Sequence, residues 1–456
     1  MNTLLIIAGI GIFGLFSEIF RIKKTLLPVV FLGLAAALVT TILDWNTNVT
    51  YFNNMMQVDN FSLAFTAVLI GITFLWFIVS PGFFLDETSK SDHFTLILFA
   101  LTGGVLLTSF NNMIMLFLGI EILSISMYIL AGSNKKSLAS NESAFKYFLM
   151  GSFATGFLLF GITLVYGATG SFDLDVITTQ ISAGNLNSSI MLLMGILLIM
   201  IAMVFKVSAA PFHFWAPDVY QGAPTVITAF MSTVVKTAAL AAFFRLFAHT
   251  FTGMADVWRT ILVVISATTI LIGNITAVYQ TNVKRMLAYS SIAHAGYMIM
   301  AIVALNTAAS SALLFYAIAY SISSIASFTI LLMVSNSTGN DSIESFHGLA
   351  KKSPFLAVMT IISMLSLAGI PPTAGFFAKY YIFVAAMENY LTPLVLIAII
   401  GSLIGVYFYF KIIIAMFREA NEKEMQFSGT YKIVLVIAGI LAVALGVFPG
   451  LITGLL

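Results

Sequence analysis

Apolar runs divide the chain into segments long enough to cross a membrane. A helix needs about 20 residues to span the hydrocarbon core, and short polar links separate the runs of this length. The pattern predicts fourteen spans, at residues 3–20, 26–43, 58–80, 93–110, 112–132, 142–167, 189–222, 224–248, 257–280, 284–305, 308–334, 354–390, 392–417 and 431–453. Because no link is large enough to fold alone, we expect an all-α polytopic membrane protein, with residues 1–456 forming one integral-membrane domain.

The seventh and twelfth of these spans contain proline. Pro211 follows Lys206 closely in the seventh span, and Pro371 and Pro372 precede Lys379 in the twelfth. Proline removes a backbone donor and clashes with the preceding turn, which breaks the helix and frees carbonyl groups. We therefore predict two broken helices, with unpaired carbonyls next to Lys206.

The two broken helices lie five spans apart. This spacing predicts two five-helix repeats, spans 4–8 (residues 93–248) and spans 9–13 (residues 257–417), flanked by three N-terminal spans (1–92) and a final span (431–453). The repeats would be inverted relative to each other because five is an odd number. Inverted repeats of this kind place an ion path at their interface.

Composition agrees with the membrane class and excludes several others. Apolar residues make up 60% of the chain and charged residues 8%, against about 25% charged in soluble domains. A net charge of +2 offers no patch for nucleic acid, and the absence of cysteine excludes thiolate-ligated iron–sulfur clusters in this chain. The five histidines are scattered, so no bound metal is expected.

A glycine pattern near the N-terminus resembles a nucleotide-binding motif only in its spacing. Gly9, Gly11 and Gly14 fit GxGxxG, but they lie inside an apolar span with no preceding strand. Small residues in such a span favour close helix packing. The first residues of the chain, Met1 to Thr3, carry no positive charge of the kind that opens a cleavable signal peptide. We therefore expect a retained first span without a nucleotide site.

The basic residues are distributed unevenly between the two sides. Three of the 20 lie inside spans, and fifteen lie in or beside odd-numbered links: Arg21, Lys23, Lys24, Lys90, Lys135, Lys136, Lys146, Lys284, Arg285, Lys351, Lys352, Lys411, Arg418, Lys423 and Lys432. Arg245 and Arg259 alone fall on the other side. The positive-inside rule then places the odd links in the cytoplasm and both termini outside.

Four charged residues lie deep within spans, namely Glu121, Lys206, Lys236 and Lys379. A charge in hydrocarbon costs a few kcal/mol or more, so each of them is a candidate functional residue. Lys236 is central in its span and cannot reach an interface. Glu121 has two interpretations: a proton carrier that pairs with a lysine, or a carboxylate capped by hydroxyls such as Ser124 and Ser126.

Lysine suits proton transfer in such a place. Burial disfavours its charged form and a nearby carboxylate favours it, so a carboxylate that approaches and withdraws makes a proton switch. Arginine could not serve, because it remains protonated in proteins. His294 is either a relay between lysines or a neutral histidine bonded within the bundle, and His213 could simply fill the helix break. Lys284 and Arg285 are interpreted as interface anchors.

Four motifs carry a resemblance to a known family. They are Lys206 to Thr225 (KVSAAPFHFWAPDVYQGAPT), Gly119 to Ser124 (GIEILS), Lys284 to His294 (KRMLAYSSIAH) and Gly369 to Lys379 (GIPPTAGFFAK). The chain is similar, over about residues 58–420, to the subunit N family of bacterial NADH:quinone oxidoreductase, respiratory complex I. The related subunits L and M and the large subunits of multi-subunit sodium/proton antiporters share the fold and the lysines.

This resemblance implies a non-redox, proton-pumping subunit of the membrane arm, in the bacterial inner membrane. Flavin mononucleotide, iron–sulfur clusters, NADH and quinone would then be handled by partner subunits, and this chain would hold no cofactor. The family's pumping residues correspond to Glu121 and Lys206 as the carboxylate–lysine pair, Lys236 as the central lysine and Lys379 as the outlet.

Two other functions stay open at this level. The chain could be a subunit of a multi-subunit cation/proton antiporter with no link to NADH, or a structural membrane scaffold. The three buried lysines argue against a scaffold. Partners distinguish the first two: a peripheral arm with flavin and clusters should co-purify with a complex I subunit, and small antiporter subunits alone with an antiporter.

Overall fold

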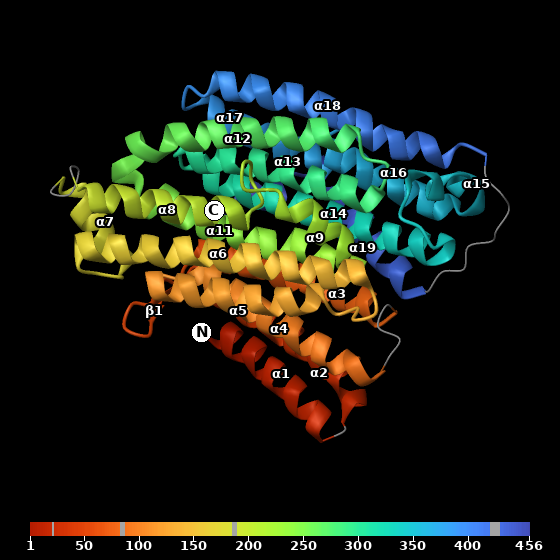
Figure 1. Ribbon diagram of the computed structural model, residues 1–456, viewed down its shortest axis with the longest axis horizontal. Helices are drawn as coiled ribbons and strands as arrows, with labels where there is room; N and C mark the ends of the chain where they lie inside the picture. Colours follow the sequence, from red (N-terminus) through yellow and green to blue (C-terminus); the bar gives the residue numbers. More distant parts are fainter. Residues whose placement is uncertain (21, 83–86, 185–188, 420–428) are drawn as a thin grey trace.

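Parallel and antiparallel helices build the protein almost entirely (Figure 1). The computed structural model describes residues 1–20, 22–82, 87–184, 189–419 and 429–456. Within these ranges, twelve helices are long and apolar enough to cross a membrane, and three shorter apolar helices accompany them: Ile190–Lys206, Pro354–Ala368 and Ala374–Met387. The all-α polytopic fold is confirmed, while the number of fourteen spans stays a prediction. Arg21 and Lys423 lie outside the described residues.

The helices follow the predicted apolar runs closely. The long ones are α1 (Asn2–Ile19), α2 (Lys23–Leu43), α3 (Asn60–Val79), α4 (Glu87–Ser109), α5 (Met113–Ala131), α6 (Leu138–Thr169), α12 (Ala255–Val278), α13 (Val283–Ala304), α14 (Ala308–Thr338), α18 (Thr392–Met416) and α19 (Gly429–Val447). Short elements connect them: η1 (Ser80–Gly82), α7 (Leu174–Ser182), η4 (Thr252–Met254), η5 (Ile343–Phe346), α15 (Leu349–Lys352) and α20 (Gly450–Thr453).

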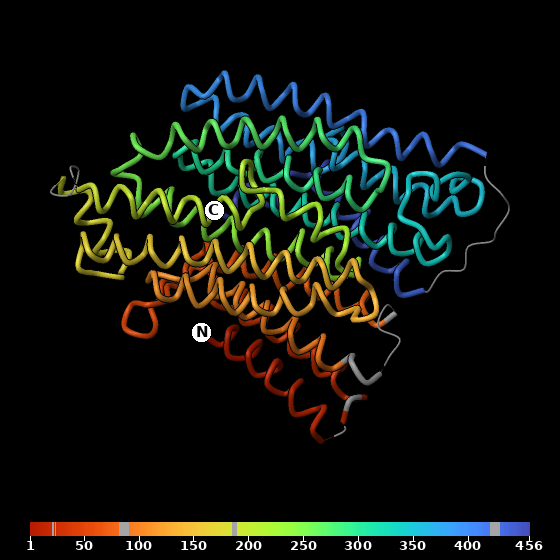
Figure 2. The backbone as a smooth tube through the Cα atoms, in the orientation of Figure 1, coloured from red at the N-terminus to blue at the C-terminus, as the bar shows by residue number. Residues whose placement is uncertain are grey.

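Both predicted helix breaks are present. The backbone leaves the helical path between α8 (Ile190–Lys206) and α9 (Trp215–Gly222), in the middle of the bundle (Figure 2). A second break separates α16 (Pro354–Ala368) from α17 (Ala374–Met387). Each break therefore brings loop backbone to the depth of the buried lysines, which is tolerated where the backbone is enclosed by protein.

The carbonyls of Val204 and Phe205, just before Lys206, are paired, against the expectation that the break leaves carbonyls there free. The Phe205 carbonyl accepts hydrogen bonds from the Ser208 amide (3.0 Å) and from Nε1 of Trp215 (3.1 Å). The Val204 carbonyl accepts one from the Ala209 amide at 2.9 Å. The turn folds back on the helix end, and the indole reaches over the break, because an unpaired carbonyl at this depth would be costly.

Three hydrophobic stretches form the centre of the bundle. The most apolar windows of residues 225–250, 283–304 and 308–338 are 100%, 94% and 94% buried by other parts of the chain. The corresponding windows of α1 and α2 are 33% and 28% buried. Since a lipid-facing helix is covered on one side only, α1 and α2 form an edge, and α13, α14 and the 225–250 stretch form the core.

The 225–250 stretch is an interrupted helix. It consists of α10 (Thr225–Phe230), the π-helical turn η2 (Met231–Val235), α11 (Lys236–Arg245) and a second π-helical turn η3 (Leu246–Thr250). Single π-turns inside α-helices occur frequently at functional sites. The first π-turn ends directly before Lys236, so the backbone geometry indicates a functional position here independently of the lysine charge.

Glycines near the N-terminus serve packing, as predicted for the GxGxxG pattern. A Cβ placed on Gly14 would lie 2.3 Å from Oγ1 of Thr95 on α4, and one on Gly11 would lie 3.0 Å from a ring carbon of Phe99. Both glycines therefore permit α1 to approach α4 closely.

Small elements cover one end of the bundle. Strands β1 (Val49–Tyr51) and β2 (Met56–Val58) pair antiparallel, with Val49 opposite Val58. The amphipathic helix α7 lies at the same end, and α15 lies at the opposite end (Figure 1). The span pattern predicted neither the hairpin nor α7, because both lie in links that are too short and too polar to carry a spanning signal.

Candidate functional site

Lys206 reaches from the end of α8 to α5. Its side chain is buried, and Nζ donates a 2.6 Å hydrogen bond to Oγ of Ser124. Ser124 donates in turn to the carbonyl of Ile120, one turn earlier on α5. The ammonium group is thus held by a hydroxyl whose own proton points to the helix backbone, so its lone pairs face the lysine.

Glu121 takes its partner from a third helix. Oγ1 of Thr155 on α6 donates a 2.7 Å hydrogen bond to Oε1 of Glu121. In the alternative interpretation a hydroxyl such as that of Ser124 or Ser126 caps this carboxylate, but these two hydroxyls donate to the carbonyls of Ile120 and Ile122. A threonine from α6 therefore occupies the place assigned to the α5 serines.

Glu121 and Lys206 are neighbours without direct contact. Among the described residues, ion pairs join carboxylates to Lys146, Arg245 and Arg285, and none joins Glu121 to Lys206. Positions 121 and 124 are three apart and share one face of α5, so the lysine ends beside the carboxylate. A cavity of about 20 Å³ lined by Ser124, Thr155 and Lys206 adjoins them, which is room for about one water molecule.

Lys236 binds the middle of α13. It is 2% exposed, and its Nζ donates to the carbonyl oxygen (2.7 Å) and to Oγ (2.5 Å) of Ser291. The Tyr320 hydroxyl of α14 donates to the same Ser291 Oγ at 2.8 Å. One serine therefore gathers a lysine and a tyrosine from two other helices, and its hydroxyl can pass a proton between them.

His294 lies three residues further along α13 and is enclosed by tyrosines. Its Nδ1 is 2.7 Å from the Tyr316 hydroxyl, and its Nε2 is 3.1 Å from the Tyr409 hydroxyl. The Tyr409 hydroxyl also bonds Ser290. Both ring nitrogens thus face groups that can donate or accept, so His294 could change its protonation state and keep both hydrogen bonds.

Lys379 returns to the break in its own span. Its Nζ donates to the carbonyl of Ala368 (2.6 Å), the last residue of α16, and to Oγ of Ser402 on α18 (2.8 Å). The same atom lies 5.2 Å from the ring centroid of Tyr297. A cation near the C-terminal end of a helix is favoured by the helix dipole, and the aromatic face adds to this.

Aromatic rings connect Lys236, His294 and Lys379 into one cluster. The centroid of His294 lies 4.8 Å from that of Tyr320, which bonds Ser291 beside Lys236. It lies 6.1 Å from that of Tyr297, the ring under Lys379. The structure therefore places these three residues together, while Lys206 and Glu121 form a separate site between α5, α6 and α8.

The partners of these residues were not identified from the sequence. They are hydroxyl groups inside otherwise apolar spans: Ser124, Thr155, Ser291, Tyr316, Tyr320, Ser402 and Tyr409. A helical spacing from the charged residues could have pointed to Ser124 and Ser291, which lie on the same helices as Glu121 and His294. The others lie on separate helices, and spacing along the chain carries no information about them.

Two further residues of the predicted set differ from expectation or stand apart. Lys284 is not an interface anchor: it is 4% exposed, and its Nζ donates to the carbonyl of Ala223, where α9 ends. His213 lies buried in the first break, stacks on Phe214, and its Nδ1 has no hydrogen-bond partner among the described residues. Neither contacts Glu121 or the lysines above through a hydrogen bond within those residues.

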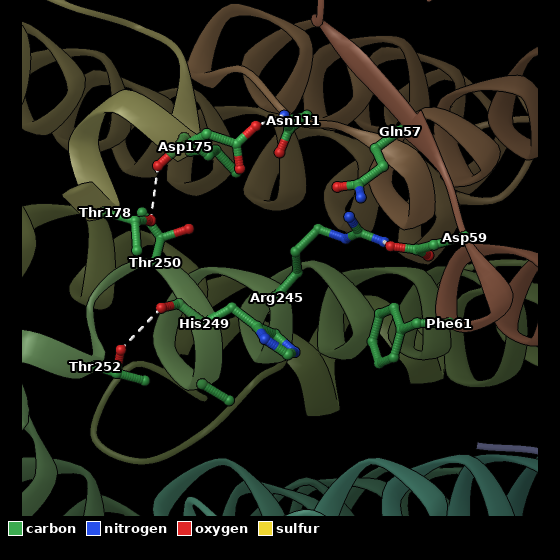
Figure 3. Close-up of a pocket in the computed structure, with 12 residues that line it drawn as sticks. Gln57, Asp59, Phe61, Asn111, Asp175, Thr178, Arg245, His249, Thr250 and Thr252 are labelled. Carbon is green, nitrogen blue, oxygen red and sulfur yellow. Dashed lines mark hydrogen bonds and ion pairs between the residues drawn. The ribbon is translucent and has the colours of Figure 1, made fainter. Parts of the chain in front are cut away.

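A polar pocket opens at the end of the bundle that carries the hairpin and α7. Its volume is about 440 Å³, and Asp59, Asn111, Asp175, Arg245 and His249 line it together with seven other residues (Figure 3). The Arg245 guanidinium points into it and holds both carboxylate oxygens of Asp59 at 2.8 and 2.9 Å. Between this arginine and Lys236, residues 238–244 are alanine, leucine and phenylalanine, all buried, so α11 offers no polar link from the lysine to the pocket.

Comparison with known proteins shows the family to which the chain belongs. The family described as NADH:quinone oxidoreductase/Mrp antiporter, TM, matches residues 110–405, more than half of the chain. "NADH-quinone oxidoreductase subunit N" of Cytophaga hutchinsonii is 46% identical, over 99% of this chain and 98% of the relative. The protein of the same name from Flavobacterium psychrophilum is 44% identical, over the full length of both.

Solved structures share the fold. A chain of respiratory complex I from Thermus thermophilus with bound aureothin aligns with a TM-score of 0.86 and 32% identity, over 99% of this chain and 98% of that one. A chain of the Mrp complex from a Dietzia species aligns with a TM-score of 0.89 and 19% identity, over 99% and 95%, and this likeness concerns the fold alone. The protein therefore belongs to the NADH:quinone oxidoreductase/Mrp antiporter family of membrane proteins and, within it, to the group named NADH-quinone oxidoreductase subunit N.

Proposed function

We propose that this chain is a proton-translocating, non-redox subunit of the membrane arm of NADH:quinone oxidoreductase. Electron transfer from NADH to quinone in partner subunits would drive protons through Glu121, Lys206, Lys236, His294 and Lys379. The observation that carries the proposal is the cluster of Lys236, His294 and Lys379, whose amines and imidazole all end on neutral oxygens. The names of the relatives support the complex to which it belongs.

The Glu121 and Lys206 site acts as the switch. Thr155 holds the carboxylate and Ser124 holds the ammonium, each at hydrogen-bond distance. A small movement of α5 against α8 exchanges these neutral partners for a direct ion pair, which favours the charged lysine. When the pair opens, burial favours release of the proton. The distance between Glu121 and Lys206 thereby controls the charge of Lys206, which acts electrostatically on Lys236.

The cluster around His294 carries the proton sideways. Ser291 and Tyr320 hydroxyls can accept a proton on one side and donate one on the other, and the Tyr320 and His294 ring centroids are 4.8 Å apart, so a proton leaving Lys236 would move toward His294. Lys379 receives it beyond Tyr297 and lies at the second helix break. Residues 238–244 of α11 are apolar and offer no proton carrier between Lys236 and the polar pocket at Arg245, which supports the path across the bundle.

The remaining features complete the proposal. The protein is multi-pass in the bacterial membrane, and the distribution of basic residues supports an arrangement with both termini outside. Flavin mononucleotide, iron–sulfur clusters, NADH and quinone belong to partner subunits, in keeping with a chain that has no cysteine. The inverted repeats, residues 93–248 and 257–417, would set the two broken helices on either side of the path.

The test is the Lys236→Ala variant, with NADH-driven quinone reduction and proton uptake measured in membranes. Assembly of the complex is checked on a native gel. We expect both activities to fall by at least about tenfold in an assembled complex, since Lys236 is the donor to the cluster and a positioned proton carrier is worth at least this much.

Two outcomes would contradict the proposal. Unchanged proton uptake would remove Lys236 from the path. Unchanged NADH oxidation and pumping, accompanied by loss of sodium or pH tolerance, would indicate a multi-subunit cation/proton antiporter instead. Co-purification with a peripheral arm that contains flavin supports the complex I subunit, and isolation with small antiporter subunits alone opposes it.

A further inference from the structure

Lys284 is a fourth buried lysine that the proposed path leaves unused. It is the second residue of α13, and its Nζ donates to the carbonyl of Ala223. The first turn of a helix disfavours a positive charge, whereas the end of α9, where Ala223 lies, favours one. The lysine therefore crosses from its own helix to the corner between α9 and α10.

Charged groups surround this corner on the side away from the cluster. Asp218 of α9 binds Arg285 of α13 and Lys146 of α6, each at 2.8 Å, and Lys146 also binds Glu142 at 2.7 Å. These side chains are between 30% and 56% exposed, so the group reaches water. We refer to Glu142, Lys146, Asp218 and Arg285 as the charged mouth.

Asp341 adds a carboxylate on the inner side. It interacts electrostatically with Lys284, and its Oδ1 is buried without a hydrogen-bond partner among the described residues. Its backbone carbonyl accepts the amide of Val283, at the start of α13. Val283 directly precedes Lys284 in the chain. A buried carboxylate oxygen without a hydrogen-bond donor at this place would stabilise an ammonium group or a proton.

The face of α13 that carries Lys284 also carries Ser291, which binds Lys236. Lys284 and Ser291 are seven residues apart, which is two helical turns on one face and about 10 Å along the axis. Ser291 binds Lys236, and the buried Tyr220 hydroxyl of α9 lies beside the same serine. The positions between them on this face, Leu287 and Ala288, are apolar, so the route from Lys284 to the central lysine runs along α9, where Tyr220 precedes Ala223 by three residues.

We propose that Lys284 is a proton-carrying residue, which receives protons through the charged mouth and passes them by way of Tyr220 and Ser291 to Lys236. This inference rests on the proposed function and adds the inlet to it. The transfer is a proton exchange: Lys284 Nζ loses a proton to the hydroxyl chain and regains one from water held at the mouth near Asp218 and Asp341. No bond other than N–H and O–H changes.

A purely structural role gives a different expectation. If Lys284 serves only to bond the Ala223 carbonyl, any side chain with a cationic donor suffices, and arginine is the best substitute. Arginine keeps the charge and the donors but does not release its proton in proteins. The Lys284→Arg variant therefore separates proton transfer from anchoring.

The experiment compares Lys284→Arg, Lys284→Gln and Lys236→Ala in the assembled complex, with Lys135→Arg as the matched control. Lys135 is an exposed lysine at the same end, between α5 and α6. NADH-driven proton uptake in vesicles, quinone reduction and assembly on native gels are measured. We expect Lys284→Arg and Lys284→Gln to lower proton uptake by at least about tenfold with assembly retained, and Lys135→Arg to match the wild type.

The outcomes distinguish the inference from the proposed function. Full pumping by Lys284→Arg, with Lys236→Ala inactive, overturns the inlet and leaves the proposed function intact. Full pumping by Lys236→Ala overturns the proposed function itself. If neither Lys284 variant assembles, Lys284 serves to stabilise the corner between α9 and α10, and the proposed role as proton inlet is wrong.

Discussion

At the scale of single residues, the buried lysines share one kind of partner. Lys206, Lys236, Lys284 and Lys379 each donate to a hydroxyl or carbonyl oxygen, and within the described residues none of them forms an ion pair. A neutral oxygen can hold an amine in either protonation state, because the neutral amine also donates. A carboxylate would hold the charged form more strongly. Such partners fix the position of the nitrogen and leave its proton exchangeable.

The first prediction concerns the hydroxyl under Lys206. Ser124→Ala removes the acceptor for Nζ, and loss of a hydrogen bond to a charged group costs about 1.5–3 kcal/mol. We expect the lysine to leave its resting position, the balance between the open and paired states to change, and coupled proton uptake to fall by roughly tenfold. Proton uptake per assembled complex is the measurement.

Ser126→Ala is the matched control for this variant. Ser126 is also buried on α5, and its hydroxyl also donates to a carbonyl four residues earlier. It contacts no lysine by a hydrogen bond within the described residues. Proton uptake should therefore stay near the wild-type level, and equal losses in the two serine variants would show that the effect arises from α5 and not from Lys206.

At the scale of elements, the two breaks use their lysines differently. At the first break, Trp215 and turn amides pair the carbonyls of Val204 and Phe205, and Lys206 reaches α5 instead. At the second break, Lys379 itself donates a hydrogen bond to the carbonyl of Ala368. An opening of the second break would therefore release Lys379, whereas the first break can stay fixed while Lys206 moves. The proposed switch therefore lies between α5 and α8, and the proposed outlet lies at the break between α16 and α17.

The second prediction tests the fit of Lys379 in its break. Gly369 ends α16 with φ +82°, and a Cβ there would lie 2.8 Å from Cδ of Lys379. Gly369→Ala should displace the lysine from the Ala368 carbonyl and, through the left-handed backbone, cost about 1–2 kcal/mol of stability. We expect a lower Tm and a severalfold loss of proton uptake.

Gly339→Ala isolates the backbone part of this effect. Gly339 ends α14 with φ +76°, and a Cβ there would meet nothing within 4 Å. This variant should lose a similar stability and retain its proton uptake. If both glycine variants lose uptake equally, the position of Lys379 is not the cause.

The sequence predicted the elements better than their contacts. Run length and proline sufficed for the helices and both breaks, because burial in lipid demands long apolar segments and closed hydrogen bonding. Lys284 was misassigned because its place at a helix start resembles an interface, and only the fold puts Ala223 over it. Thr155 was missed for the same reason: it approaches Glu121 from another helix, and an isolated threonine in an apolar run has no distinguishing spacing.

At the scale of the whole molecule, polar groups lie at the two ends of the bundle, and the buried lysines and His294 extend across its middle. The charged mouth and Lys284 lie at the end where α6 and α13 begin and α9 ends, and the polar pocket with Arg245 lies at the end with the hairpin and α7 (Figure 1, Figure 3). The apolar stretch of α11 separates the pocket from Lys236. In the path that we propose, a proton taken up at the charged mouth moves toward Lys379 and not along α11.

Protons enter at the charged mouth only if the mouth faces the cytoplasm, and a labelling experiment tests this orientation. The chain has no cysteine, so a single introduced cysteine is the only thiol that a maleimide can modify in it. Thr50→Cys in β1 and Asn134→Cys between α5 and α6 are exposed positions at opposite ends. With the odd links inside, an impermeant maleimide added to intact spheroplasts should label Thr50→Cys alone, and inside-out vesicles should reverse the pattern. If Asn134→Cys is labelled from outside, the mouth faces outward, Lys284 becomes the point of release, and the basic residues at that end need another explanation than the positive-inside rule. Labelling of both positions from one side would contradict the number of spans between them.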